Sequence, residues 1–139
     1  MTDIFIDTDV IIDFLIDREP HSREAAIIFT LIEQKKLKGF VSSLTFSNLY
    51  YVLRKIESHN KVIAKLDSIS RLLTILKVDQ QTIKYAISSG FTDFEDSIQY
   101  YCAHDIRKID VIITRNIKDY KGSEIPVMTP AEYLKMVSS

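Results

Sequence analysis

Short apolar segments alternate with longer amphipathic ones along the chain, and this alternation limits the folds that it can adopt. Residues 3–7 (DIFID) and 110–114 (DVIIT) are runs of β-forming residues closed by polar ones, which is the pattern of buried strands. We expect further strands at residues 40–42, 76–78 (LKV) and 125–128 (IPVM). Strands separated by helices predict a mostly parallel central sheet with helices on both faces, which is a three-layer α/β/α architecture.

Helices are expected between these strands. Apolar residues recur at helical spacing, and the expected helices span residues 9–16, 22–37, 44–57, 60–76, 80–88 and 93–106. Ser22 is the predicted N-cap of the second helix, and Gly39 is the residue expected to stop it. For a last helix, Thr129 is predicted to cap, with Pro130 at the first helical position and Glu132 at the third.

The size and composition of the chain predict a single domain over residues 1–139. With 139 residues and 46% hydrophobic ones, the chain is large enough for one domain with a hydrophobic core and too small for two domains. The formal net charge is −1, so binding to a polyanion would depend on a local basic patch. Cys102 is the only cysteine, which fits a reducing cytoplasm, and no run of 18 apolar residues supports a membrane span. We therefore expect a cytoplasmic protein.

Three aspartates interrupt the apolar segment FIDTDVIIDF at residues 5–14. In a parallel sheet, ligand sites lie beyond the carboxyl ends of the strands, and Asp7 occupies that end of the first strand. Without any functional site, Asp9 is explained as the cap of the helix that follows, and Asp13 as a residue on the solvated face of that helix. The strand-terminal carboxylate of Asp7 needs a partner to offset the loss of its hydration, and a divalent cation is the simplest one.

A second group of acids begins the helix expected at residues 93–106. Asp93 followed three residues later by Asp96 is typical of a helix start, which explains part of this group without any chemistry. Glu95 and Asp96 are adjacent and point about 100° apart, so only one of them can face the same pocket as Asp7. We assign Asp96 to the pocket and treat Glu95 as a neighbour or reserve ligand.

A third polar group, TRNIKDY at residues 114–120, follows the strand DVIIT. It supplies Thr114, Asn116 and Asp119, and an ordinary turn explains it equally well when it is taken alone. Because all three groups converge on one predicted edge of the sheet, together they favour a functional site.

The sequence resembles the PIN-domain ribonucleases, the fold of the VapC-type toxins of bacterial toxin-antitoxin pairs. The resemblance rests on the order and spacing of FIDTDVIID, SSLTFSNLYYVL, DFEDSIQYYCA, VIITRNIKDY and IPVMTPAEYL, and it covers nearly the whole chain. The first segment also fits the DxD opening of haloacid-dehalogenase-type phosphatases. Those enzymes are expected to carry a later Lys and a metal loop rich in Gly and Asp, which the three glycines of this chain do not provide.

This resemblance implies a PIN-like fold and Mg²⁺- or Mn²⁺-dependent hydrolysis of RNA phosphodiester bonds. Carried over by position, the metal-ligating aspartates fall on Asp7 and Asp96. The TRN element of the family falls on Asn116, with Asp119 close by. The second acid of the family, usually a glutamate, falls on Asn48, whose neutral carbonyl oxygen binds a hard cation more weakly than a carboxylate does.

The resemblance also implies substrate contacts and partners. Thr8, Thr114 and Asn116 would orient water or phosphate, and Arg115 is a candidate phosphate contact. RNA is the implied substrate, an antitoxin whose segment would fill the acidic groove is an implied partner, and a homodimer is the implied assembly.

The neutral side chain of Asn48 leaves two alternatives open. One is an active metal-dependent ribonuclease in which Asp9, Glu95 or Asp119 restores the missing charge. The other is a catalytically weakened PIN-like domain that binds RNA or protein without cutting.

Overall fold

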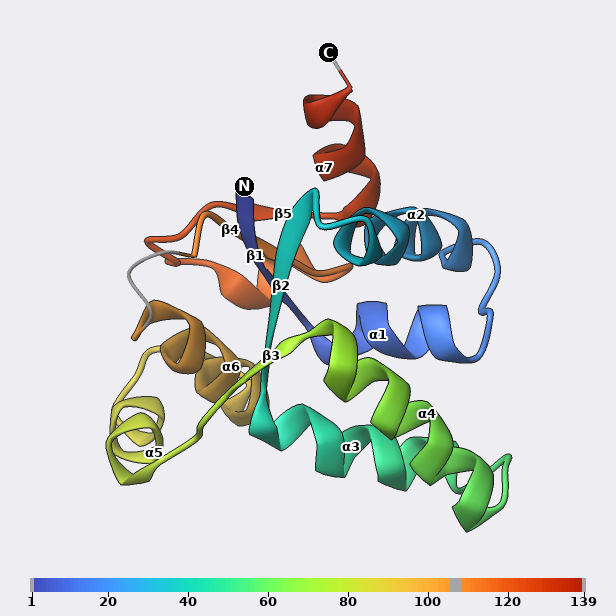
Figure 1. Cartoon of the computed structure of the whole chain (residues 1–139). Helices are drawn as coiled ribbons and strands as arrows, with labels where there is room; N and C mark the ends of the chain where they lie inside the picture. The colour runs from blue at the N-terminus through green and yellow to red at the C-terminus, as the bar shows by residue number, and fades with distance from the viewer. Residues whose placement is uncertain (1, 106–108, 139) are drawn as a thin grey trace.

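The computed structural model of the chain describes residues 2–105 and 109–138, and its five strands form one sheet (Figure 1). The strands are β1 (Thr2–Ile6), β2 (Leu37–Ser42), β3 (Thr74–Leu76), β4 (Val111–Ile113) and β5 (Val127–Met128). Their order across the sheet is β3-β2-β1-β4-β5, and each neighbouring pair is parallel. The strand order reverses between β1 and β4, and a crevice at such a reversal is where parallel sheets bind ligands.

Helices connect the strands. They are α1 (Thr8–Leu15), α2 (Ser22–Glu33), α3 (Ser43–Leu53), α4 (His59–Leu72), α5 (Gln80–Ile87), α6 (Phe94–His104) and α7 (Pro130–Val137), with a 3-10 helix, η1 (Ile117–Tyr120). Within the described parts of the chain, none of these helices has the length and apolar character needed to cross a bilayer.

The two faces of the sheet carry separate cores. Alternation along β1 sends Ile4 and Ile6 to one face and Phe5 to the other. The first face packs against α1, α2, α3, α4 and α7, and the second packs against α6 through Tyr100 and Ala103. Figure 1 shows α5 and α6 together on one side of β1 and β2, with α1, α2 and α4 on the other. The predicted three-layer α/β/α architecture is confirmed.

The second helix is shorter than predicted, and Gly39 does not stop it. The helix α2 ends at Glu33, and Gly39 lies inside β2, where the side chains of Ile32 and Leu73 pack over its backbone. The N-cap of α2 is His21 rather than Ser22, and its side chain makes no capping hydrogen bond. Close packing within the strand requires a glycine at this position. The sequence analysis interpreted the same glycine as a helix stop.

Other predicted boundaries shift by a few residues. The strand expected at 76–78 is found at Thr74–Leu76, where it pairs with β2, and the preceding helix therefore ends at Leu72. The predicted end of α6 at residue 106 lies outside the described residues. The capping box of α7 forms as expected, with Thr129 and Glu132 exchanging hydrogen bonds of 2.9 and 3.1 Å.

Gly39→Ala is expected to lower the free energy of unfolding by about 1–3 kcal/mol, the cost of overfilling a packed core. A Cβ atom at this position would lie 2.6 Å from Leu73 Cδ2 and 2.8 Å from Ile32 Cδ1, so buried side chains must move. Urea unfolding measures the change. Gly90→Ala is the matched control, since a Cβ there meets no described atom within 4 Å. Equal costs at the two positions would contradict this account.

Candidate active site

The register between β1 and β4 places Asp7 beside Thr114. Ile6 pairs with Ile113 across the two strands, so the residues that follow them meet at the carboxyl edge of the sheet. The Asp7 amide donates to the Ile113 carbonyl at 2.9 Å, and Thr114 Oγ1 donates to Asp7 Oδ2 at 2.8 Å. Two residues more than a hundred positions apart are thereby fixed at one point.

Asp7 also begins the helix α1, a role that the sequence had suggested for Asp9. The backbone N–H of Thr8 donates to Asp7 Oδ1 at 2.7 Å, so Asp7 is the N-cap. Its side chain is buried, with 6% of its surface exposed. Burial raises the pKa of Asp7, while the hydrogen bonds from Thr114 and Thr8 oppose that rise. A buried carboxylate of this kind favours the approach of a positive charge.

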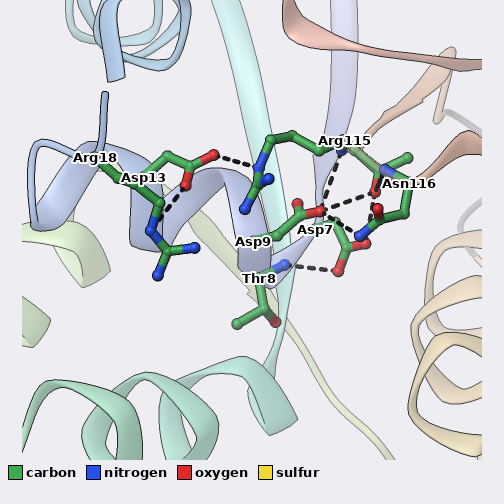
Figure 2. Close-up of polar contacts among 8 residues, drawn as sticks. Asp7, Thr8, Asp9, Asp13, Arg18, Arg115 and Asn116 are labelled. Atoms are coloured by element: carbon green, nitrogen blue, oxygen red, sulfur yellow. Dashed lines mark hydrogen bonds and ion pairs between the residues drawn. The ribbon is translucent and has the colours of Figure 1, made fainter. Parts of the chain in front are cut away.

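Asp9 shares the polar groups around Asp7 (Figure 2). Its Oδ2 accepts from Arg115 N and Asn116 Nδ2, both at 3.2 Å, and lies 3.4 Å from Thr114 Oγ1. Its Oδ1 is buried and has no hydrogen-bond partner among the described residues. Burial and then the charge of Asp7 raise the pKa of Asp9 to about 7. The hydrogen bonds to the two acids, and the charge of Arg115 near Asp9, offset only part of these rises in pKa.

A third acid, Asp96, reaches the same site from the first turn of α6. Burial raises the pKa of Asp96 to about 8, and the negative charges of Asp7, Asp93 and Asp119 add to the rise. Asp119 lies on η1, close enough for its negative charge to raise the pKa of Asp96. The structure therefore brings Asp7, Asp96 and Asp119 together.

Tyr120 lies against these acids, and sequence reasoning did not single it out. Its side chain is 2% exposed, and burial together with the negative charges of Asp7 and Asp96 raises the pKa of its phenol well above the ordinary value. The only available signal was its position at the end of TRNIKDY, directly after Asp119.

Asn48 lies on α3 and contacts an acid other than Asp7. Its Nδ2 donates to Glu95 Oε1 at 2.8 Å. Burial and then the charge of Asp93 raise the pKa of Glu95, and the charge of Glu95 in turn raises the pKa of Asp7. Glu95, whose side chain is exposed, thus lies at the same edge of the sheet as Asp7.

Thr8 turns its hydroxyl into a buried polar network beneath the acids. Thr8 Oγ1 lies 2.9 Å from Thr45 Oγ1, and Gln99 Nε2 donates to both hydroxyls at 3.0 Å. This network joins the start of α1 to α3 and α6. Sequence reasoning missed Thr45 and Gln99, whose signal was a polar residue on an otherwise apolar helix face.

Asp13 is buried, so its predicted place on a solvated helix face is wrong. Its side chain is 1% exposed and forms an ion pair with Arg115, with 2.7 Å between Asp13 Oδ2 and Arg115 Nε (Figure 2). Arg18 Nε lies 3.7 Å from the other carboxylate oxygen. Arg115 is brought there by the turn after β4, a long-range contact that the helical pattern of α1 does not reveal.

The chemistry of these acids, of which Asp7 is buried and Asp9 and Asp96 are half-buried, fits a divalent cation. Asp7, Asp9 and Asp96 all have raised pKa values, first because burial removes them from water and then because neighbouring acids repel their negative charge. Within residues 2–105 and 109–138, no group of three or more Asp, Glu, His or Cys side chains is arranged to hold a metal ion. Mg²⁺ needs only one or two carboxylates and keeps water as its other ligands, so an open set of acids suits it.

Comparison with known proteins matches the chain to one family. The family model described as PIN domain matches residues 3–118. Ribonuclease VapC1 of Aquifex aeolicus (strain VF5) is 25% identical over 135 residues, which cover 94% of this chain and 92% of that protein.

Solved structures share the fold. A toxin-antitoxin complex from Klebsiella pneumoniae contains a chain with a TM-score of 0.68 and 21% identity, covering 91% of this chain and 97% of that one. VapBC2 from Rickettsia felis, bound to a DNA fragment from its promoter, contains a chain with a TM-score of 0.66 and 16% identity, covering 92% and 98%.

We expect the metal-free protein to lose stability as the pH rises from about 4 to about 8. The raised pKa values of Asp7, Asp9 and Asp96 mean that the folded state binds protons more tightly than the unfolded chain in this range. The free energy of unfolding therefore falls until the acids ionise, near pH 7 for Asp9 and pH 8 for Asp96.

Urea unfolding in EDTA at pH 5 and pH 8 tests this expectation. Asp96→Asn removes one of these acids, so this variant should lose less stability with rising pH and exceed the wild type at pH 8. Parallel pH profiles for the two proteins would contradict the account.

Proposed function

Because the chain belongs to the PIN domain family, we propose that it is a Mg²⁺- or Mn²⁺-dependent endoribonuclease. The observation that carries the proposal is the convergence of Asp7, Asp9 and Asp96 at the carboxyl edge of the sheet, between β1 and β4. The relative named Ribonuclease VapC1, which aligns over 94% of the chain, supports RNA as the substrate.

Asp7 and Asp96 would hold the cation, with Asn48, Asn116 and Asp119 around them. When bound, the cation would polarise the scissile phosphate and lower the pKa of the attacking water. Thr114 keeps Asp7 in place through its 2.8 Å hydrogen bond.

Asp9 and Asn116 would orient the attacking water. Asn116 Nδ2 engages Asp9 Oδ2, which leaves Asp9 Oδ1 as a hydrogen-bond acceptor for that water.

Arg115 would contact the substrate, whereas Thr8 would position Asp7. The guanidinium of Arg115 meets Asp13 through Nε, so its terminal nitrogens are the groups for a phosphate contact. The hydroxyl of Thr8 is engaged by Thr45 and Gln99, so we assign Thr8 to positioning, through the N–H that it donates to Asp7.

We further propose that the enzyme is the toxin of a toxin-antitoxin pair. The relative named VapC1 supports this role, and the matched Klebsiella chain belongs to a toxin-antitoxin complex. An antitoxin segment would cover the acidic edge of the sheet, the toxin would form a homodimer, and both would act in the cytoplasm, where RNA is exposed. The second candidate, a weakened PIN-like domain that binds without cutting, is favoured only by the neutral Asn48.

Asp7→Asn is expected to reduce cleavage of single-stranded RNA by about 100-fold or more. This loss exceeds the usual cost of removing a residue that only supports a metal ligand, because Asp7 is itself a proposed ligand. An asparagine can still cap α1, so the fold should persist. Calorimetric titration with Mn²⁺ and Mg²⁺, run with a cleavage assay on the same samples, measures both effects. Asp67→Asn, on the exposed surface of α4, is the control and should match the wild type. A fully active Asp7→Asn protein would refute the proposed centre.

Induced expression of the wild type in a bacterial host is expected to arrest growth because cellular RNA is cut. The Asp7→Asn variant, expressed to the same level, should allow growth. Growth curves with protein levels measured in parallel test the role as a toxin, and unimpaired growth with soluble, cleavage-competent wild type would argue against it.

A further inference from the structure

One side of α3 leads from the acids to an exposed aromatic and basic surface. Asn48 contacts Glu95 beside the acids. Tyr51 lies three residues further along α3, and Lys55 follows in the turn after the helix. Residues at these spacings share one side of a helix, and at about 1.5 Å per residue the stripe extends roughly 10 Å from Asn48 to Lys55. Figure 1 shows α3 running from the end of β2 away from α6, so a polymer held at the acids can continue along it.

An open groove lies at the end of this stripe. It has a volume of about 420 Å³ and is lined by Tyr50, Tyr51, Arg54 and Lys55. The side chain of Tyr51 is 70% exposed, and Lys55 Nζ lies 5.1 Å from the centre of its ring, which is a cation–π contact. The hydroxyl of Tyr50 lies 2.9 Å from His59 Nδ1, and this contact fixes Tyr50. The groove therefore presents one accessible aromatic ring beside two cations.

The two cations of the groove have no acidic partner among the described residues. Arg54 Nη1 donates to the backbone carbonyl of Glu57 at 2.9 Å, which is a neutral acceptor, and Lys55 forms no ion pair with a described acid. Lys65 on α4 shows the contrast, because it pairs with the carboxylate of Glu57 at 2.7 Å. The positive charge of the groove is therefore available to an anionic ligand.

Single-stranded RNA matches both the charge and the aromatic ring of the groove. The chain has a formal net charge of −1 and gathers acids at the end of β1, so a polyanion needs a separate basic surface to approach them. Unpaired cations attract phosphates, and an exposed aromatic ring stacks on any base. A protein partner with an apolar surface would leave both cations unmatched.

We propose that the groove of Tyr51, Arg54 and Lys55 binds single-stranded RNA beside the acids, with a base stacked on Tyr51 and phosphates next to the two cations. This inference rests on the proposed ribonuclease, which supplies RNA as the ligand. It gives the groove a role in holding the substrate and none in breaking the phosphodiester bond.

Tyr51→Ala tests the stacking contact. Fluorescence anisotropy of a labelled single-stranded RNA of mixed sequence, measured in EDTA to keep the RNA intact, should show a Kd about 10-fold weaker, the scale of one lost base–aromatic stack. Tyr51→Phe keeps the ring and should bind as the wild type does. Tyr85→Ala removes another tyrosine, 51% exposed on α5, and is the matched control. Because Tyr51 is exposed, the melting temperature should not change. Wild-type affinity in Tyr51→Ala would overturn the inference.

Lys55→Gln tests the ionic contact. Each phosphate contact with a single strand contributes about 0.7 to the slope of log Kd against log salt concentration, so the slope should fall by about that amount. Lys36→Gln, in the exposed turn before β2, is the control and should keep the wild-type slope. A second copy of the chain is the competing occupant. An unchanged slope in Lys55→Gln, together with a smaller sedimenting particle for Tyr51→Ala, would identify a protein interface and overturn the inference.

Cleavage assays with Mn²⁺ on the same proteins separate this inference from the proposed function. If the wild type binds RNA through Tyr51 but does not cut it, the nuclease is refuted and the groove stands. If the wild type cuts RNA while Tyr51→Ala binds and cuts equally well, only the role of the groove is refuted. A wild type that neither binds nor cuts RNA would refute both.

Discussion

The burial of a carboxylate at the carboxyl end of β1 is the constraint on which the rest of the site depends. Asp7 is 6% exposed, and taking an ionised carboxylate out of water is costly unless it is paired or hydrogen-bonded. Thr114 and the first N–H of α1 offset part of that cost, but both are neutral. Burial and then the negative charge of Asp7 raise the pKa values of Asp9 and Asp96, and a bound cation would offset this accumulation of negative charge.

The elements around Asp7 are held in register by polar groups as well as by the apolar cores. The β1–β4 pairing fixes Thr114, and the network of Thr8, Thr45 and Gln99 fixes the starts of α1 and α3 relative to α6. These directional hydrogen bonds specify the arrangement of the three helices, although Gln99 Oε1 is buried without a partner among the described residues. The acids therefore come from separate elements that share one rigid support.

The sequence revealed the parts of the fold that depend on local pattern. Alternating strands and helices predicted the layers, and the rule for parallel sheets predicted the edge where Asp7 and Thr114 meet. The missed features are contacts between distant segments. Gly39 is defined by the side chains above it, Asp13 by an arginine from the turn after β4, and the partner of Asn48 lies 47 residues away. No local periodicity contains that information.

Because the five strands run in one direction, the sheet has a carboxyl edge that carries the acids and an opposite edge where β1 begins. β1 begins at Thr2 and α7 ends at Val137, and Figure 1 shows the start of β1 and the end of α7 at the top of the view, away from the carboxyl end of β1. An affinity handle, a fluorophore or a surface tether joined to either end would therefore leave the acids open to large polymers. The architecture thus offers attachment points for single-molecule and immobilised assays without redesign of the fold.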